Sequence, residues 1–153
     1  MGYIYAGSSS LILSVNESVD FERIGKLIKH PNIEPGLIID GEFDFDKLNR
    51  DDVTYYLMCI DSRDVGLCVI LTSDNLNFID VGFIKEARGV NAKKLGFLFK
   101  ELYFHKYPNN CLSAMINKNH RASLLFSKWM GFKIFLENEE FYFLGMKNYG
   151  WSN

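Results

Sequence analysis

The chain has 153 residues, of which 48% are hydrophobic and 24% charged, a balance that is typical of one soluble globular domain and excludes a disordered chain. Its formal net charge of −2 supplies no basic field of the kind that nucleic-acid binding needs. The sequence shows no signal peptide and no apolar run near the roughly 18 residues of a membrane span, and its number of cysteines is odd. We therefore expect a single cytoplasmic domain, residues 1–153. We expect neither nucleic acid nor a membrane as its partner.

The first third of the chain predicts a strand, a helix and an irregular acidic segment. Residues 11–15 (Leu-Ile-Leu-Ser-Val) form a short apolar run that suits a strand. A helix should follow, because Ser18 suits an N-cap, apolar residues recur at three-to-four spacing and Pro31 ends the pattern. Residues 31–52 carry seven acidic side chains against two basic ones. Such a stretch either attracts a cationic molecule or is an ordinary solvated loop.

The middle of the chain predicts three consecutive antiparallel strands. Segments 53–60 and 65–71 are rich in β-branched, aromatic and apolar residues, and they flank a short turn at 61–64, which indicates a hairpin. Polar residues at 73–75 supply the next turn, and the third strand runs over 77–84.

The last third predicts two helices and three strands. The first helix has apolar residues at i, i+3, i+4 and i+7 and ends before Pro108. A strand at 112–116 precedes the second helix, which Gly131 ends. Strands at 132–136 and 141–146 close the chain. The aromatic side chains of this tail suit either the core or an interface, such as that of a homodimer, and they are Tyr142, Phe143, Tyr149 and Trp151.

The junction between the third strand and the following helix, residues 83–95, is the most informative segment. A loop at a helix start offers backbone N–H groups and the positive end of the helix dipole, which together can hold a pyrophosphate. Arg88, Lys93 and Lys94 add cationic charge at this place. Taken alone, a loop with solvated basic residues explains the segment as well.

Two motifs in this half of the chain resemble those of the GNAT superfamily of N-acetyltransferases. Arg88 and Gly89 match the opening of its Arg/Gln-x-x-Gly-x-Gly/Ala loop, whereas Asn91 replaces the next glycine and Lys93 stands at the final small residue. Asn tolerates a left-handed backbone, so the loop conformation can survive. The side chain of Lys93 must point away from the phosphates or lie alongside them.

The second motif, residues 120–132, is similar to the superfamily's Asn-x-x-Ala-x-x-Leu-Tyr-x-x-Leu-Gly-Phe segment. The Gly-Phe ending and the apolar spacing agree. His120 falls on the asparagine, with Asn119 beside it, and Ser127 falls on the tyrosine. Together the resembling segments cover roughly residues 77–146.

The resemblance implies an α+β protein with the GNAT fold, a mixed and mostly antiparallel sheet of six to seven strands flanked by about four helices. It implies an N-acetyltransferase that uses acetyl-CoA as co-substrate and acetylates a primary amine of a protein or small molecule. Asp80, the only acid within strand 77–84, is the candidate base, unless it lies on a solvated sheet face. Ser127 stands where the family's tyrosine protonates the departing thiolate. The residues expected to bind acetyl-CoA are Phe83, Ile84, Arg88, Gly89, Val90, Asn91, Ala92, Lys93 and Asn119.

The departures from the motifs support an alternative. A serine hydroxyl is a much weaker acid than a phenol, and the loop lacks two small residues. The alternative is therefore a degenerate GNAT-fold protein with a binding, inhibitory or virion-associated role, and the loop is also similar to small GNAT-like proteins of tailed phages. No Cys/His spacing fits a metal site, and no Gly-x-Ser-x-Gly elbow of a hydrolase is present.

Overall fold

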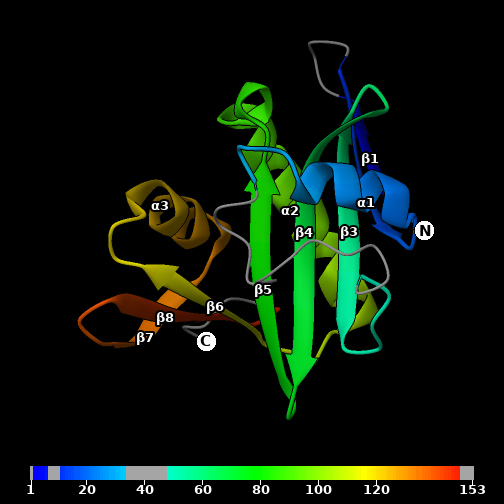
Figure 1. Cartoon of the computed structure of the whole chain (residues 1–153). Coiled ribbons are helices and arrows are strands. Elements are labelled where there is room, and N and C mark those ends of the chain that lie inside the picture. The colour runs from blue at the N-terminus through cyan, green and yellow to red at the C-terminus, as the bar shows by residue number, and fades with distance from the viewer. Residues whose placement is uncertain (1, 7–10, 34–47, 149–153) are drawn as a thin grey trace.

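The computed structural model describes residues 2–6, 11–33 and 48–148, which form an α+β fold around one sheet (Figure 1). Within these residues the sheet has eight strands in the order β1-β2-β3-β4-β5-β6-β8-β7. The strands are β1 (Tyr3–Ala6), β2 (Ile12–Ser18), β3 (Val53–Ile60), β4 (Arg63–Ser73), β5 (Leu76–Phe83), β6 (Leu112–Asn117), β7 (Lys133–Glu137) and β8 (Phe141–Met146). The helices are α1 (Phe21–Ile28), α2 (Val90–Lys106), α3 (Arg121–Met130) and a 3-10 helix at Lys85–Ala87.

Two tight hairpins build the predicted meander β3-β4-β5. Asp61 and Ser62 have φ values of 50° and 66°, and Asp74 and Asn75 have values of 49° and 67°. Positive φ at both central residues is the signature of a two-residue type I′ turn, for which Asp and Asn are well suited. Because the first turn needs only two residues, β4 begins at Arg63, two residues before the predicted start of the strand.

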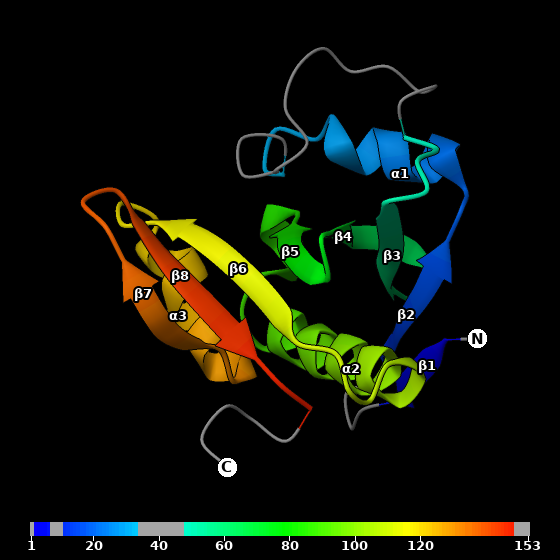
Figure 2. The same cartoon turned by 90° about the horizontal axis from the view of Figure 1, so that it is seen from below.

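Helices cover both faces of this meander, as the view from below shows (Figure 2). Successive side chains of a strand point to opposite faces, so neighbouring tyrosines of β3 meet different helices. The ring of Tyr55 packs on Phe21 of α1, with centroids 6.1 Å apart. The ring of Tyr56 packs on Phe99 of α2, with centroids 5.1 Å apart. The sheet is therefore buried on both sides here, which explains the nearly continuous apolar runs of β3 and β4.

The sheet parts between β5 and β6. These two strands are parallel and share a single register pair, Phe78 with Ser113, and beyond it they diverge (Figure 1). Strands β8 and β7 continue the sheet from β6 in antiparallel order. Helix α3 packs against α2 at Gly96, where an added Cβ would lie 3.1 Å from the Phe126 ring. The backbones of β5 and β6 therefore separate on either side of the pair formed by Phe78 and Ser113.

Most predicted elements are confirmed, with two corrections near the N-terminus. The strand β1 is not predicted from the sequence; it pairs with β2 and raises the strand count of the described residues to eight. Ser18 is not the N-cap of α1, because it belongs to β2 and pairs with Tyr55 of β3. The N-cap is Asp20, whose side chain accepts a hydrogen bond from the N–H of Arg23 at 3.3 Å.

Two expectations fall partly outside the described residues. Of the seven acidic residues in segment 31–52, only Asp51 and Asp52 lie within the described part of the chain. Tyr149 and Trp151 of the aromatic tail also lie outside it. None of the described helices is both long and apolar enough to cross a membrane.

Candidate functional site

The loop between β5 and α2 depends on one glycine. Gly89 is the N-cap of α2 with φ 96° and ψ −134°, a conformation that is essentially restricted to glycine. A Cβ added there would meet no atom of the described residues within 4 Å. Among these residues, the glycine is therefore required by its backbone angles and not by crowding.

The first N–H groups of α2 are available to a ligand. Lys93 makes the first bond of the helix, from its N–H to the carbonyl of Gly89 at 3.1 Å. No described residue accepts from the N–H groups of Val90, Asn91 or Ala92. These donors stand at the positive end of a 17-residue helix, which is a suitable site for an anion.

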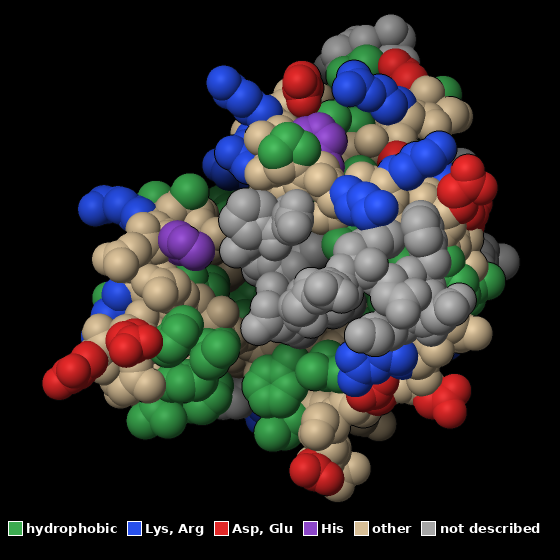
Figure 3. All heavy atoms as spheres, in the orientation of Figure 1, with side chains coloured by type: hydrophobic (Ala, Val, Ile, Leu, Met, Phe, Trp, Pro, Cys, Tyr) green, Lys and Arg blue, Asp and Glu red, His purple; other side chains and the backbone are tan. Residues whose placement is uncertain are grey.

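Positive charge surrounds this helix start. Residues 85–94 contain four basic side chains and one acidic one, a net charge of +3. Lys and Arg side chains gather along the upper edge of the molecule, over this loop and over α1 (Figure 3). A concentration of one charge sign at a cleft raises the local concentration of ligands of the opposite sign.

Asn32 forms two hydrogen bonds that join the loop between β5 and α2 to the turn after α1. Its side-chain oxygen accepts a hydrogen bond from the N–H of Lys85 at 2.8 Å. Its backbone carbonyl accepts a bond from the guanidinium of Arg88 at 3.2 Å. No local sequence motif marks Asn32, because its contacts with this loop span more than 50 residues. Arg88 thus shapes the loop in addition to supplying charge.

The side chain of Lys93 is held at α3. Its ammonium nitrogen lies 5.2 Å from the centroid of the Trp129 ring, a cation–π distance. The ring of Phe97 also packs on Trp129, with the two ring centroids 4.7 Å apart. A lysine at the family's small-residue position is therefore accommodated by an aromatic partner on the neighbouring helix.

Phe83 and Ile84 belong to the core. Phe83 is 8% exposed, and its ring packs on Phe126 of α3 with centroids 5.7 Å apart. Ile84 is 3% exposed, and its N–H donates to the carbonyl of Val65 at 2.9 Å. Neither the Ile84 side chain nor its N–H is therefore free for a ligand, and the ring of Phe83 is part of the core.

Asp80 lies on the face of β5 that α1 covers. It pairs with Val69, which pairs with Tyr55, so the three residues form one row across the sheet. Asp80 is half-buried, and its Oδ2 atom is buried, so the alternative of a solvated Asp is not what the structure shows. The buried hydroxyl of Tyr55 has no hydrogen-bond partner among the described residues, and burial raises its pKa. Only the strand register reveals that Tyr55 and Asp80 share a row.

Ser127 lies on α3 and is half-buried. It follows Phe126, whose ring packs on Phe83 of β5. Phe83 points to the face of β5 opposite to that of Asp80, because the two residues are an odd number of positions apart on the strand, so no described contact joins Asp80 and Ser127.

The turn before α3 carries no side-chain cap. Asn119 is exposed, and its N–H donates to the side-chain oxygen of Asn117 at 2.9 Å. His120 is the N-cap residue, and its side chain makes no capping hydrogen bond. No side chain of the N-cap residue therefore satisfies the first N–H groups of α3.

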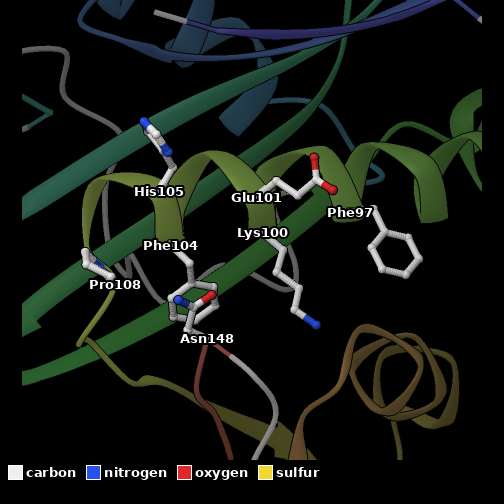
Figure 4. Close-up of a pocket in the computed structure, with 7 residues that line it drawn as sticks. All are labelled: Phe97, Lys100, Glu101, Phe104, His105, Pro108 and Asn148. Atoms are coloured by element: carbon white, nitrogen blue, oxygen red, sulfur yellow. The ribbon is translucent and has the colours of Figure 1, made fainter.

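A cavity of the described residues lies elsewhere. It measures about 590 Å³ and follows the side of α2 that is turned away from the sheet (Figure 4). Its lining residues are Phe97, Lys100, Glu101, Phe104, His105, Pro108 and Asn148. It includes none of the predicted site residues. Within the described part of the chain, no group of three or more His, Cys, Asp or Glu side chains is placed to hold a metal ion.

Comparison with known proteins gives structural matches alone. No family model and no curated protein matches the sequence. A mutant of the spermidine N-acetyltransferase SpeG from Vibrio cholerae has a TM-score of 0.66 at 10% identity, over 89% of this chain and 94% of that chain. The N-acetyltransferase PseH from Campylobacter jejuni, solved in complex with acetyl coenzyme A, has a TM-score of 0.63 at 19% identity, over 88% and 98%.

A probable GNAT-family acetyltransferase from Chromobacterium violaceum has a TM-score of 0.68 at 14% identity, over 92% of this chain and 85% of that chain. At such identities the likeness concerns the fold alone. The chain has the GNAT fold, with a mixed and mostly antiparallel sheet, as the resemblance of its motifs implies.

Proposed function

We propose that this chain is an acetyl-CoA-dependent N-acetyltransferase that acetylates a primary amine of a protein or of a small molecule. The observation that carries the proposal is the start of α2, where Gly89 has a glycine-only conformation and the next N–H groups have no acceptor among the described residues. This helix start follows β5, the strand at which the sheet parts. A diphosphate with an extended chain attached suits this arrangement, and that is the shape of CoA. The acetyl coenzyme A bound to PseH, which shares the fold, supports the same ligand.

In this proposal the loop holds CoA mainly through its backbone. The N–H groups of residues 89–92 donate to the diphosphate oxygens, and the helix dipole favours their negative charge. Arg88 and Lys93 contribute charge to the +3 loop and lie beside the diphosphate, and Asn119 contacts the chain that leads to the thioester. Since most of these contacts use backbone groups, Asn91 and Lys93 do not remove them.

The chemistry requires one proton acceptor and room for a leaving group. The amine nitrogen attacks the carbonyl carbon of the thioester, and the bond between carbon and sulfur breaks. Asp80 takes the proton that the amine loses, because it is a half-buried carboxylate on β5, the strand at which the sheet parts. Ser127 donates a hydrogen bond to the departing sulfur, and solvent supplies the proton of the free thiol.

Binding is tested by calorimetry with acetyl-CoA on the full chain. The wild type should bind saturably, and Gly89→Glu should abolish binding because it places a carboxylate at the anion site and forces a glycine-only conformation. Leu136→Glu is the matched control, since it adds the same group on β7, where Leu136 is 58% exposed. Absence of binding by the wild type at millimolar acetyl-CoA would refute the proposal.

Catalysis is tested by release of free thiol from acetyl-CoA in the presence of spermidine, of a lysine peptide and of a peptide with a free amino terminus. Asp80→Asn should lower the rate by roughly 10²-fold or more, which is the usual contribution of a general base. Ser127→Ala should have a smaller effect. Equal rates for wild type and Asp80→Asn would remove Asp80 from the mechanism.

The second candidate is a GNAT-fold protein that binds CoA or a protein partner without catalysis. The observation in its favour is the set of departures at Asn91, Lys93 and Ser127, which are small or phenolic residues in the family's motifs. Wild-type protein that binds acetyl-CoA and releases no thiol with any amine would support this candidate, including the inhibitory, virion-associated or phage-encoded forms of it.

Two further expectations belong to the same proposal. We place the protein in the cytoplasm, in agreement with the free thiols of Cys59, Cys68 and Cys111. We also retain a homodimer as a prediction, which sedimentation of the purified chain tests.

A further inference from the structure

A second cavity lies between the sheet and the C-terminal half of α2. It measures about 180 Å³, and its lining residues are Thr54, Tyr56, Ile70, Thr72, Asn77, Tyr103, Tyr107 and Asn110. Tyr103 follows the start of α2 by 13 residues, or roughly 20 Å along the helix, so this cavity is far from the loop at Gly89. We infer that it is a separate ligand site, for a small neutral molecule rich in hydroxyl groups.

The lining carries polar groups and no formal charge. It combines three tyrosines, two threonines and two asparagines with a single aliphatic side chain. A charged ligand would lose its hydration here without meeting an opposite charge, which is costly. A neutral ligand with hydroxyl groups would exchange its hydrogen bonds with water for bonds with these side chains, while the tyrosine rings cover its apolar faces.

Tyr56 joins the lining of the cavity from β3. It is 1% exposed, and its ring packs on Phe99 of α2. Burial raises the pKa of its hydroxyl, so this group stays protonated and can donate. A ligand oxygen in the cavity would accept that hydrogen bond.

The other hydroxyls offer both donors and acceptors. Tyr103 accepts a hydrogen bond from the side-chain amide of Asn110 at 3.1 Å, which leaves its own proton to donate. Thr72 donates to the side-chain oxygen of Asn77 at 2.9 Å, which leaves its lone pairs to accept. A hydroxyl group both donates and accepts, so an array of this kind matches a polyol better than an amine or a carboxylate.

The cavity also borders β5 and the turn that leads into β6. The side-chain amide of Asn77, near the start of β5, donates to the carbonyl of Cys111 at 3.4 Å, directly before β6. Asn110 precedes Cys111 in the chain. A ligand that contacts Asn77 and Asn110 would therefore join the start of β5 to the turn before β6.

The test is a titration of the full-length, isotope-labelled chain, followed by amide resonances in two-dimensional NMR. The probes are glycerol, myo-inositol and glucose, with tetramethylammonium and sulfate as a cationic and an anionic probe. We expect saturable shifts with at least one neutral probe at the residues that line the cavity, including the side-chain amides of Asn77 and Asn110. The amides of Gly89 and Val90 should not shift.

Two isosteric variants test the contacts, since they keep the volume and are expected to fold. Tyr56→Phe and Thr72→Val should each weaken the neutral probe by roughly tenfold, which corresponds to one lost hydrogen bond. Tyr142→Phe, a half-buried tyrosine on β8, should bind like the wild type. The inference is overturned by unsaturable or scattered shifts, by equal binding in all variants, or by tighter binding of a charged probe. No arm uses acetyl-CoA, so the outcome is independent of the proposed function.

Discussion

Two glycines with positive φ have different requirements. Gly131 ends α3 with φ 112° and ψ 7°, close to the left-handed helical region that Asn tolerates. Gly89 has φ 96° and ψ −134°, a region that no L-residue favours. The backbone angles thus decide which substitutions each position accepts.

We predict that Gly89→Ala and Gly89→Asn each lower the free energy of unfolding by about 1–3 kcal/mol, because neither side chain fits that backbone conformation. At Gly131, Asn should be tolerated better than Ala. Urea denaturation of the four variants measures both effects. A clear advantage of Asn over Ala at position 89 would contradict the assigned conformation.

A second residue-scale feature is the group formed by Arg23, Cys59 and Asp64. The guanidinium of Arg23 donates to both carboxylate oxygens of Asp64, with one bond of 3.0 Å from Nε. The thiol of Cys59 donates to the same carboxylate at 3.2 Å. The hydrogen bonds from Arg23 hold the pKa of Asp64 below its usual value, and burial raises the pKa of Cys59 to about 11.

The lowered pKa of Asp64 predicts a dependence of stability on pH. The ionised carboxylate of Asp64 stabilises the fold fully at pH values above the pKa that Asp64 has in the unfolded chain, about 3.9. This contribution is lost as the pH falls through the lower pKa of the folded state. Asp64→Asn should lower the free energy of unfolding at neutral pH by about 1 kcal/mol, a modest value because Arg23 is 44% exposed. The difference from wild type should shrink in acid.

Denaturation of both proteins from neutral to acidic pH measures this prediction. Glu22→Gln is the control, because Glu22 and its partner Lys26 are 78% and 75% exposed. A difference between Asp64→Asn and wild type that stays constant down to the acid limit would show that the carboxylate charge is not the cause.

At the scale of elements, the contact of β5 with the turn after α1 is tight. A Cβ added to Gly82 would lie 2.8 Å from Cγ2 of Ile33 and 3.3 Å from its Cβ. Ile33 is 2% exposed and cannot move into solvent. The glycine therefore sets the separation between β5 and this turn.

We predict that Gly82→Ala destabilises the protein by about 1–3 kcal/mol, as overpacking of a core does. Combining it with Ile33→Ala, which removes the obstructing atoms, should give a double variant more stable than the sum of the single effects implies. A double-mutant cycle by urea denaturation measures the coupling. Additive effects would mean that the two residues do not press on one another.

The order of the elements could be predicted from the sequence, whereas several of their ends could not. Periodicity places both long helices and the strands of the meander, because burial on one or two faces imposes that pattern. The prediction of Ser18 as an N-cap is wrong because serine is also compatible with a strand. Its pairing with Tyr55 of β3 makes Ser18 the last residue of β2. The segment of β1 carries no clear pattern, and its pairing with β2 alone makes it a strand.

From the sequence, only the part of the candidate site that consists of backbone groups could be predicted. Gly89 and the start of α2 follow from a local motif, because loop geometry is encoded in adjacent residues. Asn32 and Tyr55 could not be predicted from the sequence. Asn32 reaches the loop because the turn after α1 lies beside it, and Tyr55 shares a row with Asp80 because of the strand register. Asp80 was predicted as an acid on a strand, while its position on the covered face needed the structure.

At the scale of the whole molecule, acetyl-CoA should stabilise the protein. A ligand at 100 times its Kd adds about 2.7 kcal/mol to the free energy of unfolding. Hydrogen exchange should slow at residues 84–93 and at the first turn of α3, and it should change little in β1, β2 and β3. Uniform protection, or protection centred on the cavity beside Tyr103, would contradict the proposed binding position.

The parting of the sheet also has a mechanical meaning. A sheet resists bending because ladders of hydrogen bonds cross-link its strands, and such ladders join every neighbouring pair of described strands except β5 and β6. Between these two, a single register pair joins the two parts of the sheet, so we expect the seam at Phe78 and Ser113 to act as a hinge. A ligand that bridges β5 and β6 should then stiffen the sheet.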